Sequence, residues 1–123
     1  MSDTNGQAAN RARRAIAARP EKAEVRDADR MAELLGFRGV HFSQPRASKQ
    51  TPGIPDRLYL HPATGVAVWW EAKAERGRLS AAQEQMHADL RACRQAVVVG
   101  TAATIIRALQ EVMSTGRAPA DGC

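Results

Sequence analysis

The segment GIPDRLYLHPATGVAVWWEAKAERGRLSAAQ, residues 53–83, carries the most informative pattern in this chain of 123 residues. Two runs within it, 57–60 and 66–70, are rich in apolar, aromatic and β-branched residues, which favours β-strands. The residues between them, His-Pro-Ala-Thr-Gly, include a proline and a glycine that suit a tight turn. The pattern therefore predicts two antiparallel strands joined as a hairpin.

The turn predicts which residues of the two strands face each other. If residues 62–65 form a four-residue loop that ends with a positive φ at Gly65, then His61 lies opposite Val66. The same register sets Leu60 against Ala67, Leu58 against Trp69, and Asp56 against Glu71. Because side chains alternate along a strand, Lys73 points to the same face as Glu71. Two carboxylates and a lysine are thus predicted to converge.

This predicted cluster suits a divalent metal ion and phosphodiester chemistry. Two neighbouring carboxylates repel each other unless a cation or a basic group lies between them. Mg²⁺ takes oxygen ligands, commonly one or two carboxylates together with water and substrate phosphate oxygens. The candidate ligands are Asp56, Glu71 and the backbone carbonyl of Ala72. Lys73 would lie beside the attacking water, where it can orient or deprotonate that water or stabilise negative charge on the phosphate.

The same residues resemble a known family. Gly-Ile-Pro-Asp at 53–56, the hairpin, Glu-Ala-Lys at 71–73 and Leu-Ser-Ala-Ala-Gln at 79–83 resemble the VRR-NUC family of the PD-(D/E)XK nuclease superfamily. The resemblance extends from the first predicted helix to the last. It implies an α/β fold with the core order α-β-β-β-α-β-α, in which a mixed central sheet is flanked by helices.

The resemblance also implies roles for individual residues. Carried onto this chain, the catalytic residues are Asp56, Glu71, Lys73 and Gln83. In such a site the aspartate and the first glutamate bind the metal, which is Mg²⁺ or Mn²⁺, the lysine completes the site, and the glutamine supports it. A glutamate on the first helix lies alongside as a further metal ligand. Glu24 is the first candidate for that position and Glu21 is the second.

Simpler explanations compete for several of these residues. The segment 71–76 has good helix propensity, so Glu71 could belong to the start of an exposed helix. Ser80 and Gln83 have the spacing of a capping box, a role that is compatible with a second role of Gln83 in the site. We expect His41 and His61 to be structural or surface residues rather than metal ligands.

Composition and charge favour a single domain that binds a polyanion. The chain is 44% hydrophobic, which suits one modest core, and its net charge is +5 with a pI of about 10.0. It has no apolar run of roughly 18 residues and no signal-peptide pattern, so we expect a cytoplasmic protein that does not enter a membrane. The spacing of its two cysteines supports neither a zinc site nor a disulfide framework.

Basic residues outside the motif are candidates for DNA contact. Residues 1–19 hold +3 of the net charge and are predicted to form a disordered basic arm, for which a role in solubility is the alternative. The domain itself is predicted at 20–114, followed by a tail at 115–123. The candidate DNA-binding residues are Arg11, Arg13, Arg14, Arg46, Lys49, Arg76 and Arg78.

Periodicity predicts the remaining elements. We expect helices at 21–35, at 81–94 and from Thr101 onward, and further strands at 39–43 and 95–100. The run 95–100 is continuously apolar, which is typical of a buried parallel strand. In the helix at 81–94, the residues expected to face inward are Ala82, Met86, Leu90 and Cys93, with His87 on a flank.

Together these features predict a Mg²⁺- or Mn²⁺-dependent DNA endonuclease. Compact members of the family resemble Holliday-junction resolvases, which implies branched DNA as the substrate and a homodimer, because symmetric cutting needs two sites. The candidate dimer surface is the apolar last helix, with Ile105, Ile106, Leu109, Val112 and Met113. The alternatives are a non-catalytic basic nucleic-acid-binding protein and a restriction-type nuclease. The latter has little room here for a base-reading element.

Overall fold

The computed structural model describes residues 20–42, 51–74 and 76–120. Its elements follow in the order α2 (Pro20–Leu34), β1 (Arg38–His41), β2 (Arg57–His61), β3 (Val66–Ala72), α3 (Ala81–Ala92), β4 (Ala96–Gly100) and α4 (Ala102–Thr115). The predicted α/β class and the predicted order of elements are confirmed. The arginines of the predicted arm, together with Arg46 and Lys49, lie outside the described residues.

The four strands form one mixed sheet in the order β1-β2-β3-β4. Strand β2 is antiparallel to its neighbours β1 and β3, whereas β4 runs parallel to β3, as its apolar sequence predicts. In the hairpin, His61 pairs with Val66 and Leu58 with Trp69, so the predicted register is confirmed for residues 57–61. Asp56 precedes the first paired residue, Arg57, so its predicted pairing with Glu71 across the ladder is not part of the observed hairpin. Gly65 closes the turn with a φ of +76° and donates its N–H to the His61 carbonyl at 2.8 Å.

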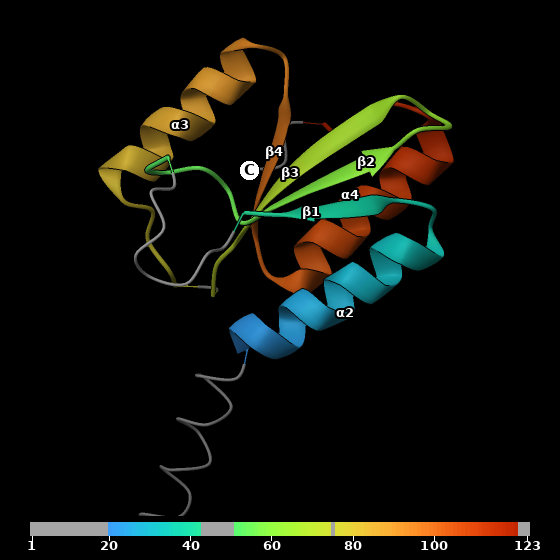
Figure 1. The fold of residues 1–123 in the computed structure, drawn as a ribbon, viewed down its shortest axis with the longest axis horizontal. Coiled ribbons are helices and arrows are strands. Elements are labelled where there is room, and N and C mark those ends of the chain that lie inside the picture. The colour runs from blue at the N-terminus through green and yellow to red at the C-terminus, as the bar shows by residue number, and fades with distance from the viewer. Residues whose placement is uncertain (1–19, 43–50, 75, 121–123) are drawn as a thin grey trace, which may run out of the picture.

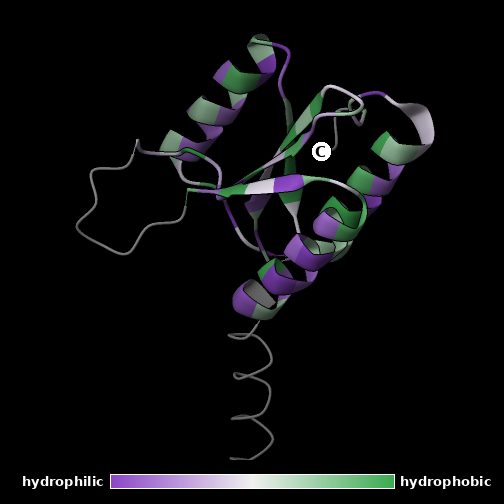
Figure 2. Ribbon diagram, turned by 45° about the vertical axis from the view of Figure 1, so that its right-hand side comes forward, coloured by the Kyte–Doolittle hydropathy of each residue, from purple (hydrophilic) through white to green (hydrophobic). Residues whose placement is uncertain are grey.

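Helices cover both faces of the sheet. Figure 1 shows α2 and α4 together on one side of the strands and α3 on the other. The core lies on the side of α2 and α4, where Trp70 and Tyr59 of the sheet are fully buried. Figure 2 shows hydrophilic residues alternating with hydrophobic ones along these helices. Truncating a buried tryptophan to alanine costs roughly 3–5 kcal/mol, so Trp70 is a principal source of stability.

Helix α4 buries most of its apolar residues within the single chain. Ile105, Leu109 and Val112 are fully buried, whereas Met113 is 42% exposed. Most of the apolar residues of α4 that were expected to form a dimer surface therefore pack against the sheet and α2 instead. No helix of the described residues is long and apolar enough to cross a membrane.

The prediction for the inward face of α3 is wrong. Ala82 and Cys93 are exposed and Leu90 is only half-buried, whereas His87, expected on a flank, is the buried residue of the helix. The prediction assumed that the most apolar face of α3 packs against the sheet, but the face that does so has His87 at its centre. The helix also ends at Ala92, and Arg94 beyond it has a positive φ of 62°.

Candidate active site

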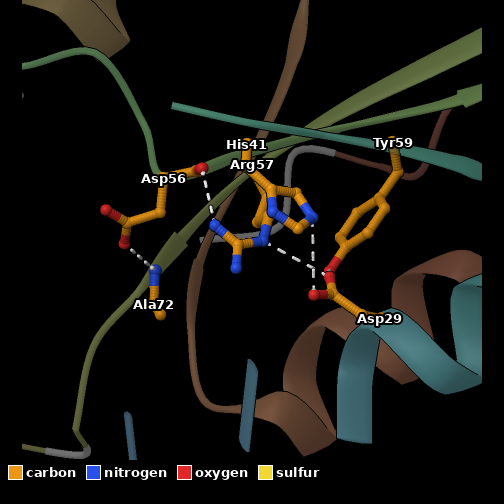
Figure 3. Close-up of polar contacts among 6 residues, drawn as sticks. All are labelled: Asp29, His41, Asp56, Arg57, Tyr59 and Ala72. Carbon is orange, nitrogen blue, oxygen red and sulfur yellow. Dashed lines mark hydrogen bonds and ion pairs between the residues drawn. The ribbon is translucent and has the colours of Figure 1, made fainter. Parts of the chain in front are cut away.

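Hydrogen bonds from three elements fix Asp56 directly before β2. Its carbonyl accepts the N–H of Phe42, the residue after β1, at 2.9 Å and Nη1 of Arg57 at 3.2 Å. Its carboxylate oxygen Oδ2 accepts the N–H of Ala72, at the end of β3, at 3.1 Å (Figure 3). The bond to Ala72 holds the carboxylate beside the C-terminal end of β3, where the sequence predicts the second carboxylate.

An aspartate on α2 anchors this arrangement from the other side. Asp29 Oδ1 accepts the hydroxyl of Tyr59 at 2.6 Å and Nε of Arg57 at 3.4 Å, and its Oδ2 lies 3.6 Å from Nε2 of His41 (Figure 3). Burial and the hydrogen bond to Asp29 raise the pKa of Tyr59 well above its usual range. The buried guanidinium of Arg57 therefore links α2 to the backbone of Asp56.

Strand β3 carries Glu71 and leads directly to Lys73. The strand continues through Ala72, so the alternative that Glu71 starts an exposed helix is wrong. The pairing of the chain with β4 extends one residue further, because the N–H of Lys73 donates to the Gly100 carbonyl at 3.0 Å. Glu71 is 3% exposed and Lys73 is half-buried. Extended backbone thus sets both side chains on the same face, as alternation predicts.

Gln83 caps the start of α3 and also lines the candidate site. Ser80 caps α3, with its Oγ accepting the N–H of Gln83 at 3.1 Å, while Oε1 of Gln83 accepts the N–H of Ser80 at 2.8 Å. The predicted capping box is confirmed. Because this bond fixes the side-chain amide at the start of α3, Gln83 is held in a defined orientation where it lines the candidate site.

All four predicted catalytic residues line one cavity. The cavity has a volume of about 670 Å³ and is lined by Lys22, Val25, Arg26, Asp56, Arg57, Glu71, Ala72, Lys73 and Gln83. Two carboxylates there face four basic side chains, so the cavity as a whole favours an anionic ligand. The residues come from α2, the entry to β2, the end of β3 and the start of α3, which are distant in the sequence.

The first helix contributes basic residues to this cavity. Lys22 and Arg26 are exposed, lie one turn apart and line it with Val25. Glu24 Oε2 instead accepts the N–H of Ala102, the first residue of α4, at 3.2 Å. The role of Glu24 as a metal ligand thus stays a prediction, and the side chain of Glu21 lies outside the described part of the chain.

The donor set suits a hard cation in a site with few protein ligands. Asp56 and Glu71 bring two carboxylates to one cavity, which Ala72 also lines. Among the described residues, no group of three or more histidines, cysteines, aspartates or glutamates could hold a metal. Two carboxylates without histidine or cysteine ligands do not suit zinc. They do suit Mg²⁺, which commonly binds one or two carboxylates and takes its other ligands from water and phosphate oxygens.

His87 lies directly behind Glu71. Its Nε2 is 3.6 Å from Oε1 of Glu71, and the imidazole is 1% exposed. Burial and the neighbouring charge of Arg91 lower the pKa of His87. His61, in contrast, has a structural role: its Nδ1 accepts the N–H of Thr64 at 3.1 Å and its Nε2 lies 3.1 Å from the Leu35 carbonyl.

Sequence reasoning missed several basic residues and the histidine. They are Lys22, Arg26, Arg57 and His87. A signal exists for most of them: two basic residues four apart on the first helix share one face, and a residue four places after Gln83 lies one turn further along the same face of α3. The predicted DNA contacts Arg76 and Arg78 are exposed in the connection between β3 and α3 and do not appear among the lining residues.

Comparison with solved structures supports this fold, whereas the two sequence comparisons found no match. No family model matches the sequence, and no curated protein matches it. A solved structure described as a VRR_NUC domain is similar over 78% of this chain and 96% of its own length, with a TM-score of 0.59 and 23% sequence identity. The chain therefore has the fold of a VRR_NUC domain, which is the fold that its Pro-Asp, Glu-Ala-Lys and Leu-Ser-Ala-Ala-Gln motifs predict.

Proposed function

We propose that this protein is a Mg²⁺- or Mn²⁺-dependent endonuclease that hydrolyses phosphodiester bonds in DNA. The observation that supports this most is that Asp56, Glu71, Lys73 and Gln83 line a single cavity with an excess of basic side chains. A non-catalytic DNA-binding protein would have no need for two carboxylates in a cavity that attracts phosphates, because each of them weakens binding to a polyanion.

The chemistry follows from the position of each residue. Asp56 and Glu71 would hold the cation, which would polarise a phosphate oxygen and lower the pKa of a nearby water. Lys73 would orient that water and stabilise the charge that develops on the phosphate. Gln83, with its Oε1 bound to Ser80, can donate its –NH₂ group to the water or to a phosphate oxygen.

Phosphate contacts around the cavity would position the strand to be cut. Lys22 and Arg26 line the cavity from α2, and Arg76 and Arg78 are exposed in the connection that follows β3. Such contacts fix the register of the backbone without reading bases. We therefore propose recognition by DNA structure rather than sequence, with branched DNA such as a four-way junction as the preferred substrate.

Incubation with a panel of DNA structures tests the activity and the substrate together. Linear duplex, flapped and four-way DNA should be incubated with the full chain, with Mg²⁺, with Mn²⁺ and with a chelator. We expect metal-dependent cleavage that is fastest on the four-way junction. Binding to all substrates without cleavage under any metal condition would favour the non-catalytic alternative.

Paired cuts in a junction would require two copies of the chain. We propose a homodimer related by a two-fold axis, although α4 supplies less exposed apolar surface than its sequence suggests. Light scattering at micromolar concentration, with and without the junction, measures the mass. A monomer in both conditions, together with unpaired nicks, would contradict the dimer and leave the nuclease proposal intact.

A further inference from the structure

Helix α3 buries a polar residue where packing alone would favour an apolar one. His87 is 1% exposed, whereas the apolar Met86 and Leu90 beside it are only half-buried. Neither ring nitrogen of His87 makes a hydrogen bond to a residue that the structure describes. Burying a polar group without a hydrogen bond costs on the order of 1–3 kcal/mol. The burial of His87 therefore costs stability, which indicates that the imidazole has a role other than packing.

The surroundings of the imidazole indicate that role. Its Nε2 lies 3.6 Å from Oε1 of Glu71, just beyond hydrogen-bonding distance, and both side chains are excluded from water. His87 is four residues after Gln83, so the two share one face of α3. Gln83 lines the cavity and His87 lies one turn further along, behind the carboxylate. A small movement of either side chain would complete a hydrogen bond between His87 and Glu71.

We propose that His87 is a positioning residue for Glu71. The Nε2–H of His87 donates a hydrogen bond to Oε1 of Glu71 and so directs the carboxylate toward the cation. This inference rests on the proposed function. Hydrogen bonds from surrounding residues to a metal-binding carboxylate fix its orientation, and removing one typically costs 10–100-fold in metal affinity or activity. A direct bond from His87 to the metal is less consistent with the described residues, where the nearby donors are the oxygens that Mg²⁺ prefers.

Two substitutions separate positioning from packing. His87→Leu removes the donor and fills the space, whereas His87→Gln keeps an N–H at a position close to that of Nε2. Because Leu relieves the buried polar group, we expect the melting temperature of His87→Leu to be unchanged or higher. Leu90→Ala serves as the matched control, since it removes a half-buried apolar side chain from the same helix and leaves His87 in place.

Mn²⁺ binding to the full chain, measured by calorimetry without DNA, is the first readout. The metal concentration for half-maximal single-turnover cleavage of a four-way junction is the second. We expect His87→Leu to weaken both by about 10–100-fold. We expect His87→Gln to return both to within a few-fold of the unmodified protein, and Leu90→Ala to lower the melting temperature with little effect on either.

Each remaining outcome contradicts a defined claim. Unchanged metal dependence in His87→Leu would overturn the positioning role. An equal loss of metal affinity in His87→Gln and His87→Leu would also overturn it, because the retained N–H donor would then have no effect. If His87→Leu does not fold, His87→Met makes the same comparison. Failure of the unmodified protein to bind Mn²⁺ or cleave DNA would contradict the proposed function itself.

Discussion

At the residue scale, the position of Asp56 depends on a glycine three places before it. Gly53 has a φ of +83°, and a Cβ on it would overlap the backbone carbonyl of Ala82 in the first turn of α3. The loop that carries Asp56 therefore packs directly against the helix that carries Gln83. A left-handed conformation costs an L-residue roughly 1–2 kcal/mol, and the overlap adds strain of about 1–3 kcal/mol.

Gly53→Ala should consequently lower both stability and cleavage. The matched control is Gly65→Ala, where φ is also positive, at +76°, but no atom lies within 4 Å of an added Cβ. Thermal unfolding should show a small decrease in stability for the control and a larger one for Gly53→Ala, which alone should reduce cleavage at a temperature where both are folded. Equal effects of the two substitutions would show that the close approach to Ala82 is unimportant.

At the element scale, Glu24 joins the N-termini of the two helices on the core side of the sheet. Thr101 occupies the N-cap position of α4 but makes no side-chain capping bond, and the Glu24 carboxylate meets the Ala102 N–H instead. A carboxylate there also interacts favourably with the helix dipole. The contact is therefore a cap supplied by another helix, with a stabilisation of about 0.5–2 kcal/mol.

Glu24→Ala should lower the melting temperature while the folded protein keeps its affinity for Mn²⁺. Glu24→Gln, which retains an acceptor oxygen, should be intermediate in stability. Thermal unfolding and calorimetric metal titration check the two effects separately. A large decrease in Mn²⁺ affinity at unchanged stability would instead establish Glu24 as the metal ligand that the family resemblance implies.

The sequence predicts elements better than it predicts which faces they bury. The turn at 62–65 and the alternation around it define the hairpin, so the pairing of Leu58 with Trp69 follows from local chemistry. The face of α3 does not follow from hydrophobicity, because the buried residue is His87 rather than one of its apolar neighbours. Likewise, the spacing of Lys22 and Arg26 places them on one face of α2, but only the packing of that helix brings this face to the cavity.

At the scale of the whole molecule, the predicted basic arm holds most of the excess positive charge. Deleting residues 1–19 removes +3 of the net +5. We expect weaker DNA binding and a flatter dependence of log affinity on log salt, by about 0.9 for each phosphate that the arm neutralises. Binding isotherms at several salt concentrations measure this slope, and an unchanged slope would show that the arm does not touch DNA.

The central claim is that Asp56, Glu71, Lys73 and Gln83 form one metal-dependent hydrolytic site. The most direct test is single-turnover cleavage of a labelled four-way junction by the unmodified protein, Asp56→Asn and Lys73→Ala in Mg²⁺, with junction affinity measured in parallel in Ca²⁺. We predict that each substitution slows cleavage by at least about 10²-fold while affinity changes only a few-fold, because other phosphate contacts maintain binding. Cleavage by either variant at the unmodified rate would contradict this claim.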